Sequence, residues 1–256
     1  MPARPTSALR RLTLTEGRLF LRDPSALFFA LLFPALLLTV LGLVMPWADL
    51  PFDETDPELA GVTWITGFTP IMLVLAIATV SFTTFPTLVA TYRQRGVLRR
   101  MSTTPVPPWK LLVAQVLVNL AALLVACLFA LALAVGVLDV GLPAQPATFV
   151  LAFVLTVLGT FAIGAVIAAV APTTSAATGF GMTAYFVSLL LGGVWVPLQV
   201  MPEGLRRVAE LTPVGAGSQA MTAAWLAQPF PTSSMVVMAV WALVGIPLAA
   251  RLFRWT

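Results

Sequence analysis

Basic side chains gather between residues 92 and 110, in a stretch that separates two long apolar runs. This stretch holds five basic residues and no acidic one: Arg93, Arg95, Arg99, Arg100 and Lys110. Arginine and lysine beside apolar runs keep a segment on the cytoplasmic side of a membrane, and the residues around Gly96 are expected to form a short amphipathic helix. The chemistry that this pattern predicts is the binding of a protein or of lipid, not catalysis.

The residue types that the common catalytic centres need are missing. The chain has no histidine and one cysteine, Cys127, which excludes Ser-His-Asp triads, disulfide frameworks and Cys/His metal sites. Its one lysine, Lys110, follows Pro108 and Trp109, so no GxxxxGK[ST] phosphate loop can form. The sequence GAGSQ at 215–219 is not a GxSxG nucleophile elbow. We therefore expect a chain that is not an enzyme, has no ATPase site and holds no cofactor or metal.

The composition is that of a membrane protein. Hydrophobic residues make up 59% of the chain and charged residues 9%, against roughly a quarter charged in a soluble domain. Five stretches contain no Asp, Glu, Lys or Arg: 24–48, 59–92, 111–138, 140–202 and 211–250. Because a span needs only about 20 apolar residues, the sequence predicts an all-α integral membrane protein. Its residues 1–256 are expected to form a single transmembrane domain.

We predict six transmembrane helices with both termini in the cytosol. The expected spans are 26–45, 66–90, 111–138, 149–171, 178–196 and 234–250. This arrangement places 12 of the 14 basic residues on the inner side, and the exceptions, Arg206 and Arg207, have Glu203 and Glu210 as near partners. Orientation thus accounts for the net charge of +4, and no nucleic-acid partner is expected. The first apolar run is longer than a signal-peptide core and is kept as a span.

Three segments have a pattern of their own. Residues 1–25 are predicted to form a cytosolic interfacial amphipathic helix; the alternative is an unstructured basic tail that only sets orientation. Its apolar face would hold Leu12, Leu19 and Phe20, and its basic face Arg11, Arg18 and Arg22. Residues 197–233 are too apolar for a loop and too broken for a span, which predicts an outer re-entrant helical hairpin. In the fourth span, Gly159, Gly164 and Ala168 have the spacing that lets helix backbones approach closely.

The predicted spans lack the ionisable residues with which ion-driven carriers usually work. A self-powered carrier is therefore disfavoured, although sodium sites built from carbonyls and hydroxyls stay open. The predicted spans have the architecture of a transport pathway, with no visible energy source for transport in the chain itself. The basic segment at 92–110 is the expected attachment point for a separate subunit that supplies this energy.

Three segments resemble a known family when taken together. The run YRQRGVLRRMSTTPVPPWKLLVAQ is similar to the cytosolic segment of the membrane subunits of type-2 ATP-binding-cassette (ABC) exporters, specifically the multidrug and antibiotic-resistance permeases. The sequence Arg22-Asp23-Pro24, with Pro34, resembles the family's entry into the first span, and residues 197–220 resemble its outer re-entrant segment. With the six-span count, the resemblance covers almost the whole chain.

The resemblance implies a permease that dimerises, with an identical or a related chain, and docks a separately encoded ABC ATPase that binds ATP and Mg²⁺. The helix after the second span would be the coupling helix, assisted by the N-terminal helix. The residues that this implies for ATPase coupling are Arg95, Gly96, Leu98, Arg99, Arg100 and Thr104, with Arg18 and Arg22. Many relatives have an acidic residue where this chain has Arg93 or Arg95. The alternative is that the arginines only set topology and bind anionic membrane lipid.

The resemblance also implies export of a hydrophobic or amphiphilic substrate, such as a drug, an antibiotic or a lipid-like molecule, from a bacterial plasma membrane. The candidates for lining its pathway are Thr79, Phe82, Thr83 and Phe85 on the second span and Tyr185, Ser188 and Trp195 on the fifth. Hydroxyls in a span can instead bond to their own helix, and aromatic side chains can instead face lipid. Two other functions remain as alternatives: a secondary carrier or channel that works alone, and a non-transporting scaffold or enzyme.

Overall fold

The computed structural model describes residues 5–52, 61–102, 107, 109–196, 198 and 201–253. Helices make up most of this part of the chain, and extended backbone pairs within it only at one bridge, between Pro51 and Thr63. The predicted all-α class is therefore confirmed.

Five helices are long and apolar enough to cross a membrane. They are the continuous helix Trp64–Gln94, α7 (Trp109–Val137), α8 (Pro146–Val170), α9 (Thr174–Leu191) and α12 (Thr232–Leu252). The first of them is built from α4 (Trp64–Thr79), the π-helical turn η2 (Val80–Thr84) and α5 (Phe85–Gln94). Each lies where a span was predicted. The first predicted span, 26–45, corresponds to a shorter apolar helix, Phe28–Val44, so the count of six stays a prediction.

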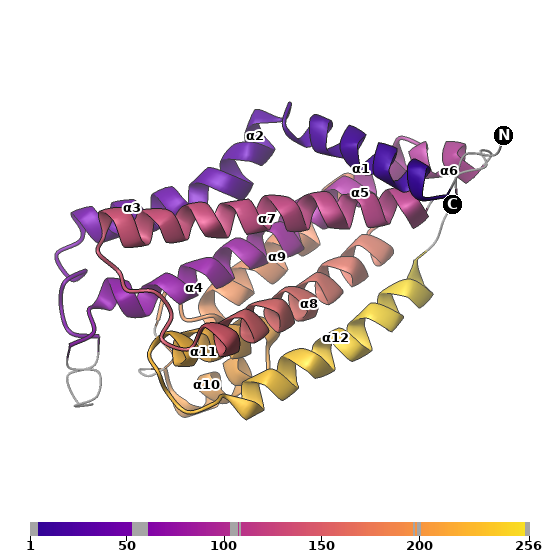
Figure 1. Cartoon of the computed structure of the whole chain (residues 1–256). Helices are drawn as coiled ribbons and strands as arrows, with labels where there is room; N and C mark the ends of the chain where they lie inside the picture. The colour runs from indigo at the N-terminus through magenta and orange to yellow at the C-terminus, as the bar shows by residue number, and fades with distance from the viewer. Residues whose placement is uncertain are drawn as a thin grey trace.

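Short helices lie at both ends of the bundle (Figure 1). Helix α1 (Pro5–Phe20) and α6 (Val97–Ser102) lie at the end where α12 finishes, and α10 (Glu203–Glu210) and α11 (Pro213–Trp225) lie toward the opposite end. The segment predicted as an interfacial helix, 1–25, is thus helical from Pro5 to Phe20. The described part of the segment predicted as a hairpin contains two helices, α10 and α11, with the turn between them at Leu211 and Thr212.

Two of the prolines within the helices follow shortly after a π-helical turn. The turn η1 (Phe28–Leu32) follows α2 (Pro24–Leu27) and precedes α3 (Phe33–Val44), whose second residue is Pro34. The turn η2 likewise precedes Pro86, the second residue of α5. A proline ring clashes with the carbonyl one turn earlier and donates no backbone hydrogen bond, and a widened turn relieves both problems. Both helices therefore continue through their prolines.

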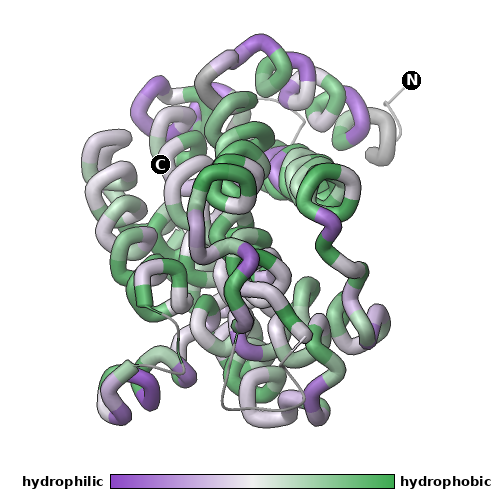
Figure 2. The backbone as a smooth tube through the Cα atoms, turned by 90° about the vertical axis from the view of Figure 1, so that its left-hand side faces the viewer, coloured by the Kyte–Doolittle hydropathy of each residue, from purple (hydrophilic) through white to green (hydrophobic). Residues whose placement is uncertain are grey.

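The helix that runs through η2 lies at the centre of the bundle, and 94% of its most apolar 18-residue stretch is buried. Small residues let its neighbours approach: Gly164 on α8 packs on the carbonyl of Ser81, and Gly181 on α9 packs on the carbonyl of Phe82. The Ser81 and Thr160 hydroxyls, both fully buried, lie 3.1 Å apart and satisfy each other. The close approach predicted for Gly164 is confirmed. Figure 2 shows the bundle as largely hydrophobic, with hydrophilic segments in α1 along the top and in α10 at the lower left.

Candidate transport cleft and coupling surface

A cleft of about 1440 Å³ runs along the bundle between α3, the α4–α5 helix and α9. Its lining is mostly apolar and includes Phe29 and Phe33 before and in α3, Met72 in α4 and Phe186 in α9. Charged groups occur only near the α1 end of the lining, where Glu16, Asp23 and Arg95 reach it. A large apolar cavity with a few polar groups at one end suits an amphiphilic ligand.

Aromatic side chains form the end of the cleft that lies away from α1. Trp47 stacks edge-on against Trp64 at 6.0 Å and against Phe68 at 6.1 Å between ring centroids. All three rings line the cleft, as does Trp195 beyond the end of α9. Edge-to-face packing adds stability beyond the area that each ring buries. This end of the cleft is therefore a firm apolar surface.

A row of threonines forms the middle of the cleft wall. Thr79 donates to the carbonyl of Leu75 at 2.8 Å and contacts the Tyr185 hydroxyl at 3.3 Å. Thr83 donates to the carbonyl of Thr79 at 2.6 Å. Thr87, a turn further on, pairs with Thr178 of α9 at 3.4 Å. The two interpretations of these hydroxyls are thus compatible, because each bonds within the protein while its residue lines the cleft.

The predicted pathway residues divide into two groups. Thr79, Thr83, Tyr185 and Trp195 line the cleft. Phe82 is 1% exposed inside the main core, Phe85 packs on Phe161 with ring centroids 5.7 Å apart, and half-buried Ser188 is not part of the lining. A pathway role for any of these residues stays a prediction.

The predicted coupling segment forms a sharp turn and a short helix. Gly96 has φ +67°, a left-handed conformation that favours glycine, and it separates α5 from α6. Leu98 is buried and anchors α6, while Arg99 and Arg100 are exposed, and Arg100 donates to the carbonyl of Arg95 at 3.0 Å. The other predicted coupling residues on the described chain, Arg18 and Arg22, are exposed on and just after α1. Thr104 lies outside the described residues.

Sequence reasoning missed a polar cluster at the inner end of the cleft. The carboxylate of Glu16 on α1 accepts hydrogen bonds from the Tyr92 hydroxyl at 2.5 Å and from the Gln115 amide. Gln115 also lies 3.2 Å from the Tyr92 oxygen. Glu16 is only 8% exposed. The one signal in the sequence was that Glu16 is one of only two acidic residues, with Asp23, among the arginines of residues 1–25.

Arg93, near the start of the coupling segment, joins three elements. Its guanidinium donates to the carbonyl of Ala171 at 2.9 Å and lies 3.4 Å from the carbonyl of Ala169, at the end of α8. It also lies over the ring of Phe253, after α12, at 5.1 Å from the centroid. A cation at a helix C-terminus is favourable because the carbonyl ends carry partial negative charge.

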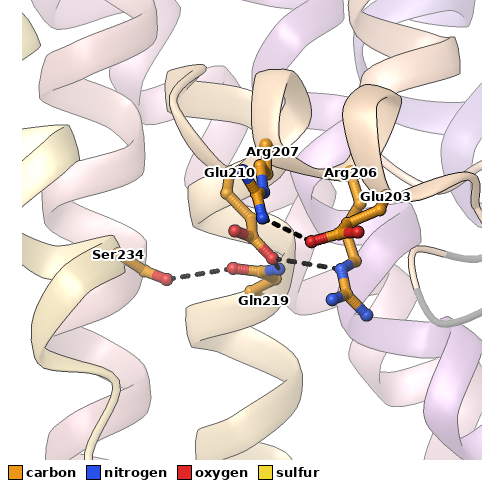
Figure 3. A network of polar contacts seen from close by, with 6 residues as sticks. All are labelled: Glu203, Arg206, Arg207, Glu210, Gln219 and Ser234. Carbon is orange, nitrogen blue, oxygen red and sulfur yellow. Dashed lines mark hydrogen bonds and ion pairs between the residues drawn. The ribbon is translucent and has the colours of Figure 1, made fainter.

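The opposite end of the bundle has its own polar network (Figure 3). Arg206 pairs with Glu210 at 3.7 Å, and Arg207 pairs with Glu203, as the sequence predicted. The network then passes from Glu210 to Gln219 on α11 at 3.2 Å and on to Ser234 on α12 at 3.3 Å. The ion pairs are exposed, so each contributes little stability. The network connects α10, α11 and α12.

Within the described residues, no cluster of His, Cys, Asp or Glu could hold a metal ion. The fold and cleft define a multi-pass helical membrane protein. Residues 7–226 match the family described as ABC-2 type transporter, and the chain belongs to that family. The resemblance in the sequence is thereby confirmed at the level of an ABC-2 permease subunit. It is the transmembrane component of a transporter and not itself the ATPase. A search of curated proteins gave no match.

Proposed function

We propose that this chain is the membrane permease of an ATP-driven exporter that moves a hydrophobic or amphiphilic molecule, such as a drug, an antibiotic or a lipid-like compound, out of a bacterial cell. A separate ATPase subunit, which binds ATP and Mg²⁺, docks on the α1 and α6 end. The chain itself holds no cofactor. Both termini lie in the cytosol of a bacterium, and the membrane is the plasma membrane.

The cleft is the observation that carries this proposal. It extends from charged groups beside α1 and α6 to aromatic rings at the far end, and its middle offers hydroxyls and apolar side chains. An amphiphile could keep its polar part at the α1 end while its apolar part lies among the rings.

A second copy of the chain, or a related chain, would close the open side of the cleft. The helices that border this side expose large apolar side chains, with Leu43 on α3 64% exposed and Phe186 on α9 60% exposed. Such faces suit either lipid or another apolar helix surface. Pairing two clefts would enclose one pathway between two permeases.

Coupling is tested by reversing charge on α6. The double variant Arg99→Glu with Arg100→Glu is expected to lose co-purification with the ATPase encoded beside the permease, because it replaces the exposed cations of the proposed docking helix by carboxylates. The remaining inner arginines still orient the helices, so membrane insertion should persist. The matched control is Arg206→Glu with Arg207→Glu, the same charge change at the opposite end, where binding of the ATPase should stay normal. Equal binding by both double variants would contradict the coupling role of α6.

The pathway is tested by labelling single cysteines, since the only natural cysteine is Cys127, which is buried. In a Cys127→Ala background, Thr83→Cys in the cleft wall is to be modified with a bulky maleimide. Export and substrate-stimulated ATP hydrolysis should then fall by about tenfold or more, as expected when transport needs a free cleft. Leu243→Cys, on the outer face of α12 and 75% exposed at the native residue, is the control that should keep activity after labelling.

Transport by the purified permease alone under an ion gradient would instead favour the secondary carrier. Export that survives labelling of the cleft cysteine would favour a scaffold role for this chain.

A further inference from the structure

One buried carboxylate connects α1 to both chain segments that hold the coupling helix. Glu16 is the only acidic side chain less than a tenth exposed among the described residues. Its two donors come from far along the chain: Tyr92 lies in the last turn of α5, and Gln115 lies in the second turn of α7. Helix α6 lies between them in sequence. The carboxylate therefore binds the two arms of the α5–α6–α7 hairpin at one point.

The hydrogen bonds to Glu16 run in one direction, from donors on α5 and α7 to the acceptor on α1. An ionised carboxylate only accepts hydrogen bonds, so the Tyr92 hydroxyl and the Gln115 amide both point toward α1. Hydrogen bonds to a charged acceptor are shorter and stronger than neutral ones. Gln115 is 2% exposed, and without the carboxylate its amide would keep only the longer contact with the Tyr92 oxygen, at 3.2 Å.

Helix α1 in turn leads into a wall of the cleft. After α1 the chain passes through Leu21 and Asp23 into α2, η1 and α3, and α3 lines the cleft. Helix α1 also packs extensively on α7, for example with Gly17 beside Val118. Apolar packing is non-directional, so it alone does not fix how the two helices are placed along each other. The carboxylate adds directional hydrogen bonds to Tyr92 and Gln115, and a displacement of α6 that carries these two residues would carry α1 with it.

We propose that Glu16 is a positioning residue that makes α1 move together with α6, so that a shift of the coupling helix reaches the cleft wall formed by α3. This inference rests on the proposed docking of an ATPase at α6. It assigns Glu16 no contact with ATP. A docked subunit can shift the transmembrane helices only through contacts that differ between its two states. The cluster of Glu16, Tyr92 and Gln115, which we call the clamp, would carry that difference to α1.

The test is hydrogen exchange on the full permease–ATPase complex, with and without a non-hydrolysed ATP analogue. In the natural protein, nucleotide is expected to change the exchange of backbone amides in α6 and in α1 together. In Glu16→Ala the change in α6 should remain, and the change in α1 should shrink about fivefold or more, the size of a lost allosteric coupling. Thr15→Ala is the matched control, because Thr15 is exposed and its hydroxyl donates to the Arg11 carbonyl within α1. It should behave as the natural protein does.

A swap separates positioning from simple loss of stability. Gln115→Glu alone puts two carboxylates together and should uncouple α1. Adding Glu16→Gln restores one carboxylate and one amide, and should restore the nucleotide response of α1. A response of α1 in Glu16→Ala equal to that of the natural protein, or a swap that stays uncoupled, would overturn the proposal.

The clamp and the docking can fail separately. If no ATPase binds the natural permease, the proposed function fails, and the permease alone still tests the clamp. In it, Glu16→Ala should speed exchange in α1 about tenfold or more relative to Thr15→Ala, because a charge-assisted bond is lost. Equal exchange in these two variants would refute the clamp, whatever the ATPase does.

Discussion

Replacing Gly181 by alanine is expected to destabilise the bundle strongly, and Gly164→Ala should do the same. A Cβ at Gly181 would lie far closer than 3.0 Å to the carbonyl oxygen of Phe82, and one at Gly164 equally close to that of Ser81. Real Cβ atoms essentially never approach another atom so closely. The opposing atoms are backbone, so no side chain can rotate away.

The cost follows from where these contacts lie. Both carbonyls belong to η2, the turn in the central helix that α8 and α9 flank. An added methyl group must push α8 or α9 away from this turn and loosen its packing. In Gly164→Ala the separation would also stretch the buried pair between Ser81 and Thr160. Overpacking a dense core costs about 1–3 kcal/mol and more where backbone is involved.

The effect is measured by thermal unfolding in detergent. The readout is the fraction of the protein that stays monodisperse as the temperature rises. Gly179→Ala is the matched control: it lies in α9 two residues from Gly181, and nothing is within 4 Å of an added Cβ. Alanine there should be neutral or stabilise by about 0.5–1 kcal/mol, since glycine weakens a helix interior. An unchanged unfolding temperature in Gly181→Ala would show that the helices pack less closely than described.

The helices could be predicted because the bilayer sets their length. Gaps between charged residues marked every apolar helix, and the spacing of Gly159 and Gly164 indicated where α8 meets its neighbours. A Cβ added at Gly159 would lie 3.3 Å from the carbonyl oxygen of Met238, and Gly164 contacts the Ser81 carbonyl. Gly181 was missed because nothing in its own span shows which backbone lies opposite. Such a contact depends on the rotation of two helices, which an apolar sequence fixes poorly.

The cleft was predicted only in part for the same reason. Alternation of polar and apolar residues cannot orient a central helix that is buried on nearly all sides, so Thr79 and Thr83 were identified together with Phe82, which points into the core. The cluster around Glu16 was missed because its members lie 76 and 99 positions apart in sequence. In a basic segment, an acidic residue usually indicates a solvated face. Burial by α5 and α7 gives Glu16 a different environment.

Reversing the charge of Arg93 is the second change expected to have a large effect. Arg93→Glu removes the hydrogen bond to the Ala171 carbonyl at 2.9 Å and the cation–π contact with Phe253 at 5.1 Å. It also places a carboxylate beside carbonyls at the negative end of the α8 dipole. Charged hydrogen bonds contribute about 1.5–3 kcal/mol, and the contact with the ring about 0.5–1 kcal/mol. Repulsion by the carbonyls adds to this loss.

Part of that loss is offset, because two other nitrogens of Arg93, Nε and Nη2, are buried without a hydrogen-bond partner. Desolvating them costs free energy that the substitution recovers. We therefore expect a net destabilisation of about 2 kcal/mol, since the charged hydrogen bond and the carbonyl repulsion outweigh this gain. Arg10→Glu makes the same charge change on the exposed face of α1, at the same end of the molecule. It should leave the unfolding temperature within about a degree, because exposed substitutions rarely exceed about 0.5 kcal/mol. If Arg10→Glu lowers that temperature as much as Arg93→Glu does, net charge at this end, and not the contacts of Arg93, stabilises it.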